Sequence, residues 1–195
     1  MLTHVFFVRH AHSAYTPDEL GRPLSQKGLA DAKRVSDILE KEKIDVIISS
    51  PYQRAIQTVE KVAKTRRKEI ILEEAFKERT LSVKPVKDFP FAIAKVWEEP
   101  TFAWDGGESN VIAQKRGVQG LLNTLDKYEG QHIVIATHGN ILTLIMNFFN
   151  EKYDVHFWET LDMPDVYHVT FEQKKLEAVN RLWYRQAIKE ERNEQ

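Results

Sequence analysis

The chain has 195 residues, with 42% apolar and 29% charged side chains, a net charge of −1 and no cysteine. This composition is typical of a soluble globular domain, and it provides no basic surface for nucleic acid and no thiols for disulfides or metal sites. The apolar run from Val5 to Val8 is far too short for a signal-peptide core or a membrane span, so we expect a cytoplasmic protein with no membrane partner.

Short apolar runs between turn residues predict strands, and apolar residues that recur every three to four positions predict helices. In chain order, the predicted strands are 5–8, 45–48, 70–72, 133–136, 166–171 and 176–184. The predicted helices are 25–43, 51–65, a stretch between Gly107 and Gly130, and 140–149. Strands that alternate with helices indicate an α/β fold, a three-layer α/β/α domain with a mostly parallel central sheet. The last two strands suit an antiparallel hairpin at one edge of that sheet.

Residues 79–107 depart from this alternation, because they include three prolines and five aromatic residues without a clear period. We expect this segment to be an irregular, partly helical lid insertion within a single domain that spans residues 1–195. The charged C-terminal residues, 188–195, are expected to fray.

Polar residues end two of the predicted buried strands. Arg9 and His10 follow the first apolar run, and Thr137, His138 and Gly139 follow the fourth strand. In open α/β sheets, ligands bind at the carboxyl ends of the strands. We therefore expect the two imidazole rings to share one pocket.

Another strand end supplies a second arginine. Ser49 and Ser50 lead into Pro51, a favoured first residue of a helix, and Arg54 lies in the first turn of that helix. Free backbone N–H groups and the macrodipole make a helix N-terminus favourable for an anion. Two guanidinium groups, those of Arg9 and Arg54, that converge on one spot suit a phosphate better than a carboxylate.

Simpler interpretations stay open for each residue alone. Arg9 and His10 could merely cap a strand, and Arg54 could be a solvated helix residue. His12 also allows a metal-site interpretation. Alternate residues of a strand point to the same side, so His10 and His12 could bind one cation, and His138 could complete the ligand set. We expect the remaining histidines to be surface or edge residues: His4, His132, His156 and His168.

Cleavage of a phosphate ester would also need a proton donor. Glu73, Glu74 and Glu78 all follow the third predicted strand closely enough to reach the crevice. Carboxylates in such acidic runs are mostly solvated, so their position alone leaves the choice among the three open.

Taken in order, these residues resemble the signatures of the histidine phosphatase superfamily, the phosphoglycerate mutase-like proteins. The matching motifs are Arg9-His10, Ser50-Pro51-x-x-Arg54-Ala55-x-Gln57-Thr58 and Thr137-His138-Gly139-Asn140, with secondary matches at Leu24-Ser25-x-x-Gly28 and Gly107-Glu108-Ser109. Each motif alone is weak, but the ordered set covers residues 5–140 and is specific. The resemblance implies the fold described above, with no metal and no cofactor.

The resemblance also implies that His10 is the nucleophile, which takes the phosphoryl group as phosphohistidine. Three further side chains would cradle the phosphate: Arg9, Arg54 and His138. Thr16 falls where the family commonly has an asparagine that touches the phosphate. Together the implied substrate-binding residues are Ser13, Thr16, Gly139 and Asn140.

The acid that the resemblance implies is Glu78. The family's acid usually precedes a glycine by four residues, and Glu78 with Ser82 fits that spacing better than either earlier glutamate. The chain departs from the family here, because Ser82 replaces the glycine and the Trp-Glu-Gly that often follows is missing. It also departs after the nucleophile, where Ala11 and His12 replace the usual glycine and acid. These departures leave the identity of the substrate open.

We therefore predict a metal-independent phosphomonoester hydrolase, a histidine acid phosphatase-type enzyme that acts on a small phosphorylated substrate or a phosphoprotein. A neutral imidazole is a competent nucleophile, and phosphoryl transfer mainly requires alignment and charge neutralisation. A phosphoglycerate mutase-type transfer is one alternative; Gly139-Asn140 favours it, although the chain is short for that branch. A metal-dependent hydrolase is a second alternative, and a non-catalytic phosphate-binding module that needs no acid is a third.

Overall fold

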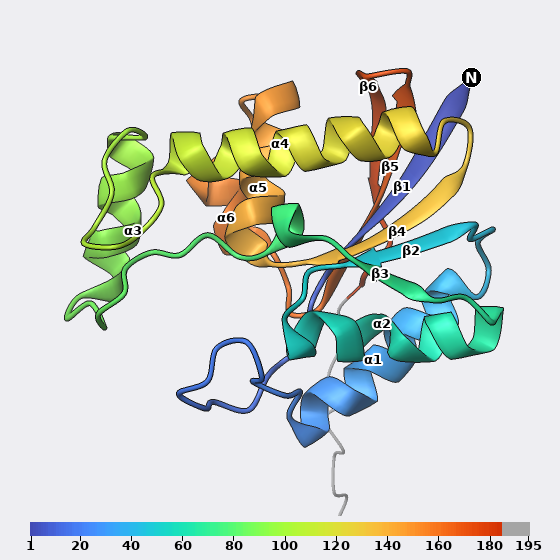
Figure 1. The fold of residues 1–195 in the computed structure, drawn as a ribbon, viewed down its shortest axis with the longest axis horizontal. Helices are drawn as coiled ribbons and strands as arrows, with labels where there is room; N and C mark the ends of the chain where they lie inside the picture. Colours follow the sequence, from blue (N-terminus) through green and yellow to red (C-terminus); the bar gives the residue numbers. More distant parts are fainter. Residues whose placement is uncertain (185–195) are drawn as a thin grey trace, which may run out of the picture.

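The structure is a computed structural model that describes residues 1–184, so the tail that was expected to fray, 188–195, lies outside the described residues. Within residues 1–184, six strands form one sheet in the order β3-β2-β4-β1-β5-β6 (Figure 1). The strands are β1 (Leu2–Arg9), β2 (Val46–Ser49), β3 (Ile70–Leu72), β4 (His132–Thr137), β5 (Asp165–Glu172) and β6 (Lys175–Arg181). Strands β1 to β4 run parallel, and β5 and β6 are antiparallel to their neighbours.

Helices cover both faces of this sheet. They are α1 (Gln26–Leu39), α2 (Gln53–Arg66), α3 (Phe89–Glu98), α4 (Asn110–Lys127), α5 (Gly139–Phe149) and α6 (Val155–Thr160), with a 3₁₀ turn η1 at Glu74–Phe76. Figure 1 shows α1 and α2 on one side of the sheet and α4 and α5 on the other, which confirms the predicted α/β fold. Helix α6 was not expected, because six residues are too few to show a helical period. Among residues 1–184, none of the helices has the length and apolar character needed to cross a membrane.

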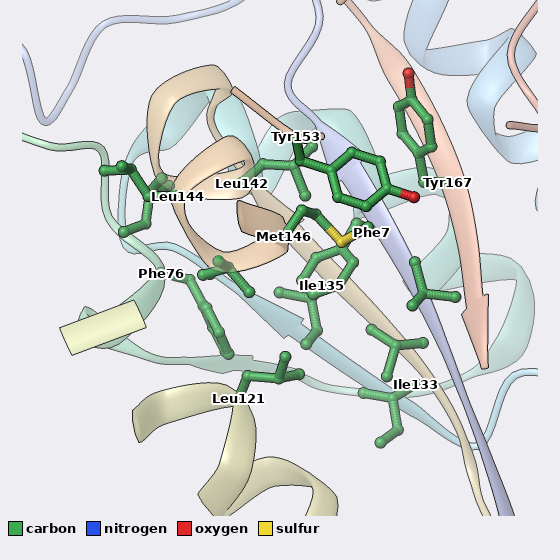
Figure 2. Close-up of a cluster of buried hydrophobic side chains, with 14 of the residues drawn as sticks. Phe7, Phe76, Leu121, Ile133, Ile135, Leu142, Leu144, Met146, Tyr153 and Tyr167 are labelled. Carbon is green, nitrogen blue, oxygen red and sulfur yellow. The ribbon is translucent and has the colours of Figure 1, made fainter. Parts of the chain in front are cut away.

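Strand β1 contains an unbroken apolar run because both of its faces are buried. Phe6 and Val8 pack with α1 and α2, whereas Val5 and Phe7 pack with α4 and α5. Figure 2 shows the cluster of buried side chains on the α4 and α5 side, in which Phe7 lies among side chains from the sheet and the helices. Complete burial of one such side chain stabilises the fold by about 1.5–3 kcal/mol.

The last two strands form the predicted antiparallel hairpin at the edge of the sheet. Its turn contains Gln173 with φ of 55°, a left-handed conformation that usually favours glycine. Strand β6 ends at Arg181 and not at the predicted residue 184, because the chain turns inward there and buries Trp183 on the α1 and α2 side. The guanidinium of Arg34 lies over the ring of Trp183, 4.2 Å from its centroid.

Helix α1 is shorter at its C-terminal end than the predicted 25–43. It ends at Leu39, and Nη2 of Arg66 on α2 donates to the carbonyl oxygens of Leu39, Glu40 and Glu42 at 2.7–3.2 Å. Carbonyl groups at the end of a helix have no partner within the helix and need one from elsewhere. The side chain of Arg66 therefore stabilises the end of α1 and the turn towards β2.

The segment 79–107 has helix α3 between two irregular stretches, as predicted. Backbone bonds close its base: the N–H of Val83 donates to the carbonyl of Asp105 at 3.0 Å, and the N–H of Glu108 donates to that of Thr80 at 2.7 Å. Figure 1 shows α3 beside the N-terminal end of α4, at the margin of the molecule. Its role as a lid over the crevice stays a prediction, as does the assignment of the whole chain to one domain.

Three histidines that were expected at the surface or an edge instead form a half-buried cluster on β1, β4 and β5. The rings of His4 and His132 stack with centroids 4.4 Å apart, and Nδ1 of His4 is 2.9 Å from Nε2 of His168. The register of the three strands brings these residues together, and no local pattern in the sequence encodes that register. His156 is exposed, as expected.

The register of the parallel strands also places polar residues together at their carboxyl ends. Strand β1 pairs with β4 so that Arg9 lies opposite Thr137, and β2 pairs with β4 so that Ser49 lies opposite Ala136. The residues that follow these pairs meet at the carboxyl ends of the parallel strands: His10, Ser50 and His138.

Candidate active site

His10 directly follows β1 and is only 7% exposed. Its Nδ1 lies 2.7 Å from the carbonyl oxygen of Ala11, which can only accept, so Nδ1 carries the ring proton. The Nε–H of Arg54 donates to Nε2 of His10 at 3.3 Å, so Nε2 presents its lone pair. Burial, and next the cations Arg54 and Arg9, lower the pKa of His10 to about 3. The ring is therefore neutral, and Nε2 is its nucleophilic nitrogen.

His138 follows β4 and is completely buried at the start of α5. Its ring centroid lies 5.1 Å from that of His10, so the two strand ends bring the two rings together, as expected. Nε2 of His138 is hydrogen-bonded to the hydroxyl of Ser50 at 2.7 Å, while its Nδ1 has no partner among residues 1–184. Burial, and then His10 and Arg54, hold the pKa of His138 well below its usual value, so this ring is neutral as well.

Arg54 projects from the first turn of α2 and is almost completely buried. Its Nη1 donates to the carbonyl oxygen of Glu19 at 2.7 Å, and its Nη2 lies 3.2 Å from the Glu19 carboxylate. The guanidinium also lies over the ring of Tyr52, 4.7 Å from the centroid. Arg54 therefore contacts the His10 ring and a carboxylate at the same time.

Two backbone N–H groups at the start of α2, which were expected to favour an anion, are bonded within the chain. The N–H of Tyr52 donates to the hydroxyl of Ser50 at 3.3 Å, and that of Gln53 donates to the carbonyl of Leu20 at 2.9 Å. At this helix end an anion would therefore be held mainly by the side chain of Arg54.

Arg9 ends β1, and backbone carbonyl groups hold its guanidinium. Nη1 donates to the carbonyl oxygens of Leu161 and Asp162 at 2.9 and 3.2 Å, while Nε has no partner among the described residues. A Cβ atom on Gly139 would lie 3.1 Å from Cζ and Nε of Arg9, closer than most real Cβ contacts. The glycine after His138 thus leaves space for the Arg9 side chain.

The loop that holds Arg9 is itself fixed by Asp165. The buried carboxylate of Asp165 accepts from the N–H groups of Asp162 and Val166 at 2.9 and 3.0 Å, and it pairs with Arg181 at 2.6 and 3.0 Å. Burial raises the pKa of Asp165, although the bond from Arg181 opposes that shift. Sequence analysis missed this support, because residues 161–165 are related to Arg9 only by the pairing of β1 with β5.

Glu78 lies at the N-terminus of α5, beside His138. One of its carboxylate oxygens accepts from the N–H groups of Arg79 and Ile141 at 2.9 and 3.0 Å, and the other accepts from Asn140 at 3.2 Å. The macrodipole of α5 favours a negative group at this position. The N–H of Asn140, which was expected to contact the phosphate, is therefore used by Glu78 in this structure.

The two earlier glutamates are engaged by their own turn. Glu73 caps η1 by accepting from the N–H of Ala75 at 3.0 Å, and Glu74 is exposed and pairs with Lys77 at 3.6 Å. Among the three candidate acids, Glu78 is the one whose carboxylate is bonded to the helix that follows His138.

Comparison with known proteins agrees with this arrangement. A family model for the histidine phosphatase superfamily (branch 1) matches residues 5–183. The chain belongs to this superfamily. Phosphoserine phosphatase 1 of Hydrogenobacter thermophilus is 30% identical to it over an alignment of 150 residues, with 69% of this chain and 70% of that protein covered.

Two further relatives support the same family. Phosphoglycerate mutase-like protein 4 of Arabidopsis thaliana is 28% identical over an alignment of 155 residues, with 71% of this chain and 67% of that protein covered. The solved structure of Bacillus stearothermophilus YhfR matches with a TM-score of 0.77 and 25% identity, over 90% of this chain and 94% of that one. The predicted membership of the histidine phosphatase superfamily is thus confirmed.

Several residues of the superfamily motifs position the loop that begins at His10. The N–H of Ala11 donates to the hydroxyl oxygen of Thr58 at 3.0 Å, and the side-chain oxygen of Gln57 accepts from the N–H of Leu24 at 2.8 Å. A Cβ atom on Gly28 would lie 2.0 Å from a backbone oxygen of the same loop, so only glycine allows α1 to approach it this closely. These motif residues therefore support His10 through the backbone.

Two predicted substrate-binding residues, Thr16 and Ser13, lie in the loop between β1 and α1. The hydroxyl of Thr16 donates to the carbonyl of Asp18 at 3.0 Å, and Ser13 forms an isolated backbone bridge with Leu24. These contacts lie within the loop itself, and contact of either residue with phosphate stays a prediction.

His12 does not face the histidine pair. It is exposed, and its Nδ1 is hydrogen-bonded at 2.8 Å to the hydroxyl of Ser25, the cap of α1. The metal-ligand set of His10, His12 and His138 is therefore not brought together. In residues 1–184 no other group of three or more histidine or acidic side chains is placed to hold a metal ion.

Sequence analysis missed two charged residues of the same loop, Glu19 and Arg22. The carboxylate of Glu19 pairs with both Arg22 and Arg54, and the charge of Arg22 helps to lower the pKa of His10. Arg22 also donates to the carbonyl of Thr16 at 3.0 and 3.3 Å, which fixes its side chain. No local pattern in the sequence indicates where the side chains of this loop point.

Proposed function

We propose that this chain hydrolyses phosphate monoesters through a phosphohistidine intermediate on His10. The observation that carries the proposal is the tautomer of His10: Nδ1 is protonated towards the carbonyl of Ala11, and Nε2 presents its lone pair next to Arg54. An anion that binds Arg54 would bring its phosphorus in front of that lone pair. Membership of the histidine phosphatase superfamily supports this chemistry.

In the first step, Nε2 of His10 attacks phosphorus in line with the ester oxygen. The N–P bond forms, the P–O bond to the leaving group breaks, and the leaving oxygen takes a proton from Glu78. Arg9 and Arg54 neutralise the peripheral oxygens, which is the main electrostatic requirement of phosphoryl transfer. The bonds of Glu78 at the start of α5 keep its carboxyl group beside His138, which supports this role.

In the second step, water attacks the phosphohistidine. Glu78, now ionised, accepts a proton from that water as the new P–O bond forms and the N–P bond breaks. Inorganic phosphate is released, and His10 returns to its neutral form. The ester and water are the reactants, and both steps balance with them.

His138 contributes a positive charge to this mechanism only when the substrate is bound. Its low pKa makes the ring neutral in this structure, because it is buried beside His10 and two arginines. A phosphate dianion beside the ring would favour its protonated form. The positive charge on His138 would therefore arrive together with the substrate, when charge develops on the phosphoryl group.

The assignment to the histidine acid phosphatase type is part of this proposal. It rests on His10 staying unprotonated in mild acid. An ordinary histidine, with a pKa of about 6.5, would be protonated and inactive in mild acid. Burial lowers the pKa of His10 to about 3, so its nucleophilic form persists as the pH falls through that range. We therefore expect that protonation of His10 does not lower kcat/KM near neutral pH.

We propose a small phosphorylated molecule as the substrate, since phosphoserine phosphatase 1 is among the similar proteins. A phosphoglycerate mutase-type transfer is a second candidate, favoured by the similarity to phosphoglycerate mutase-like protein 4. The two functions differ in whether water or a second hydroxyl takes the phosphoryl group. A cytoplasmic location stays a prediction.

A screen of small phosphate monoesters across a range of pH, with a metal chelator present, tests the proposal. We expect turnover that the chelator does not reduce and that His10→Ala abolishes while the variant stays folded. Loss of activity with the chelator would favour a metal-dependent hydrolase. Phosphate binding without turnover of any ester would favour a non-catalytic binding module.

A further inference from the structure

Every nitrogen of the Arg54 guanidinium already has a partner within the chain. Nε donates to Nε2 of His10 at 3.3 Å, Nη1 donates to the backbone carbonyl of Glu19 at 2.7 Å, and Nη2 lies 3.2 Å from the Glu19 carboxylate. The nucleophilic lone pair of His10 is therefore covered by Arg54, and Arg54 is held in that position by Glu19.

The carboxylate of Glu19 is placed much as an anion would be. One of its oxygens pairs with Arg54 and the other pairs with Arg22, so one carboxylate bridges two guanidinium groups. Bridging of two fixed cations by two oxygens is also how a phosphate would bind here. Burial lowers the pKa of Arg54 and Glu19 opposes that shift, so Glu19 is the main counter-charge of this buried cation.

The contacts of Glu19 are divided between its backbone and its side chain. The carbonyl groups of Glu19 and Leu20 accept from Arg54 Nη1 and from the N–H of Gln53, which fixes the loop on α2. The side chain of Glu19, in contrast, is 56% exposed, while that of Arg54 is only 6% exposed. The carboxylate can therefore move into solvent while the loop backbone keeps its bonds.

We propose that Glu19 is a positioning residue that competes with phosphate for Arg54 and Arg22. Its carboxylate keeps the pair of arginines together and holds Arg54 across His10. An incoming phosphate displaces the carboxylate, draws Arg54 away from Nε2 and exposes the nucleophile. After hydrolysis the carboxylate returns and helps to release inorganic phosphate. This inference rests on the proposed function, because it takes Arg54 to be a phosphate ligand.

Competition of this kind changes affinity more than the rate of the chemical step. Removal of the Glu19 charge should tighten the binding of inorganic phosphate and lower KM by the same factor, about three- to tenfold for an ion pair with one exposed partner. The kcat should stay level or fall, because tighter binding also slows the release of phosphate. A residue that merely stabilised the loop would instead raise KM when it is replaced.

The test is the dissociation constant of inorganic phosphate, measured by calorimetry on the full chain for wild type, Glu19→Gln and Glu19→Asp. We expect the tightest binding for Glu19→Gln and an intermediate value for Glu19→Asp, which keeps the charge but is shorter by one methylene group. Asp18→Asn is the matched control, because it removes the same charge from the neighbouring residue and keeps an oxygen for the bond from Gly21. Its phosphate affinity should stay within about twofold of wild type.

Melting temperatures of the variants show whether each is folded, and Glu19→Ala provides a second variant without the charge. Unchanged or weaker phosphate binding by both folded Glu19→Gln and Glu19→Ala would overturn the inference, while the proposed function would stand. An equal gain of affinity in Asp18→Asn would also overturn it, because general charge would then explain the effect. If Arg54→Lys binds phosphate as well as wild type does, the phosphate pocket itself is wrong and both proposals fail.

Discussion

The central strands gather histidines at both ends, and the two groups differ in what surrounds the rings. At the carboxyl ends, His10 and His138 lie 5.1 Å apart between centroids, with arginines and Glu78 around them. Nearer the amino ends, the rings of His4, His132 and His168 are partners of one another through stacking and one hydrogen bond. The two groups thus offer the same side chain in two environments.

The comparison shows which property marks a reactive site. Burial lowers the pKa of His132 and His168 as it does that of His10 and His138, so a lowered pKa does not separate the groups. The difference lies in a fixed charge that directly contacts a ring nitrogen. A guanidinium donates to Nε2 of His10, whereas in the other cluster Nδ1 of His4 bonds to Nε2 of His168 and Nδ1 of His132 has no partner among the described residues.

The largest effect should come from replacing one histidine in each group. His10→Ala should lower kcat on the order of 10⁴-fold or more, because the nucleophile is lost, with no large loss of stability. His168→Ala should keep kcat within about twofold but lower the free energy of unfolding by about 1–3 kcal/mol, since it loses the bond to His4 and a stacked contact with Phe6. Steady-state kinetics and thermal unfolding of both variants check this. Loss of activity in folded His168→Ala would contradict the separation of the two groups.

The next effect concerns the acid. Glu78→Gln keeps the size of the side chain but cannot give a proton to the leaving oxygen, so activity on alkyl phosphates should fall by about 100-fold to 10,000-fold. A nitrophenyl phosphate, which has a good leaving group, should lose at least about tenfold less. Glu73→Gln and Glu74→Gln are the matched controls and should show no dependence on the leaving group. If one of them shows it and Glu78→Gln does not, the acid is that residue.

A smaller effect is expected for the arginine that adjoins His10. Arg54→Lys keeps the charge but cannot present a planar fork, and the loss of one charge-assisted hydrogen bond is worth ~1.5–3 kcal/mol. The expected fall in kcat/KM is therefore about tenfold to a hundredfold. Arg66→Lys makes the same exchange on the same helix, where the guanidinium holds only the end of α1, and it should leave kcat/KM unchanged. Equal kinetics for the two variants would remove Arg54 from the pocket.

The smallest effect concerns acid stability. Because the pKa values of His132 and His168 are lowered by burial, the unfolded chain binds protons before the folded one. Stability from this cluster should therefore be present above about pH 6.5 and decline as the pH falls further. The cluster is half exposed, so the change should be below about 1 kcal/mol, or a few degrees in Tm.

The double variant His132→Gln, His168→Gln isolates the contribution of this cluster. Its Tm should depend less on pH than that of wild type between about pH 7.5 and about pH 5.5. The remaining slope should include the burial of His10 and His138, whose pKa values are lowered as well. A slope equal to that of wild type would show that the cluster does not titrate with folding.

The parts of the site that the sequence predicted are those encoded by local patterns. Unbroken apolar runs identified β1 and β4, and the polar residues after them led to His10 and His138. The position of Arg54 followed from a serine-proline helix start. The choice of Glu78 required the resemblance to a family, because three glutamates in one acidic stretch have the same local signal.

The remaining parts depend on how distant segments pack, and no local pattern predicts that. The Arg9 guanidinium is held by carbonyl groups that lie about 150 residues away in sequence, at Leu161 and Asp162. Glu19 reaches Arg54 because an irregular loop folds back on α2. The cluster of His4, His132 and His168 depends on strand order, and its members were therefore expected at the surface.

The most direct test of the account is to find the phosphoryl group on the chain during turnover. Wild type mixed with a phosphate monoester, quenched within one turnover and digested at neutral or alkaline pH, should yield a single phosphorylated peptide with the group on His10. Glu78→Gln should accumulate more of it when the leaving group is good, because attack by water lacks its base. Phosphate on a serine, or continued turnover by His10→Ala, would contradict the mechanism.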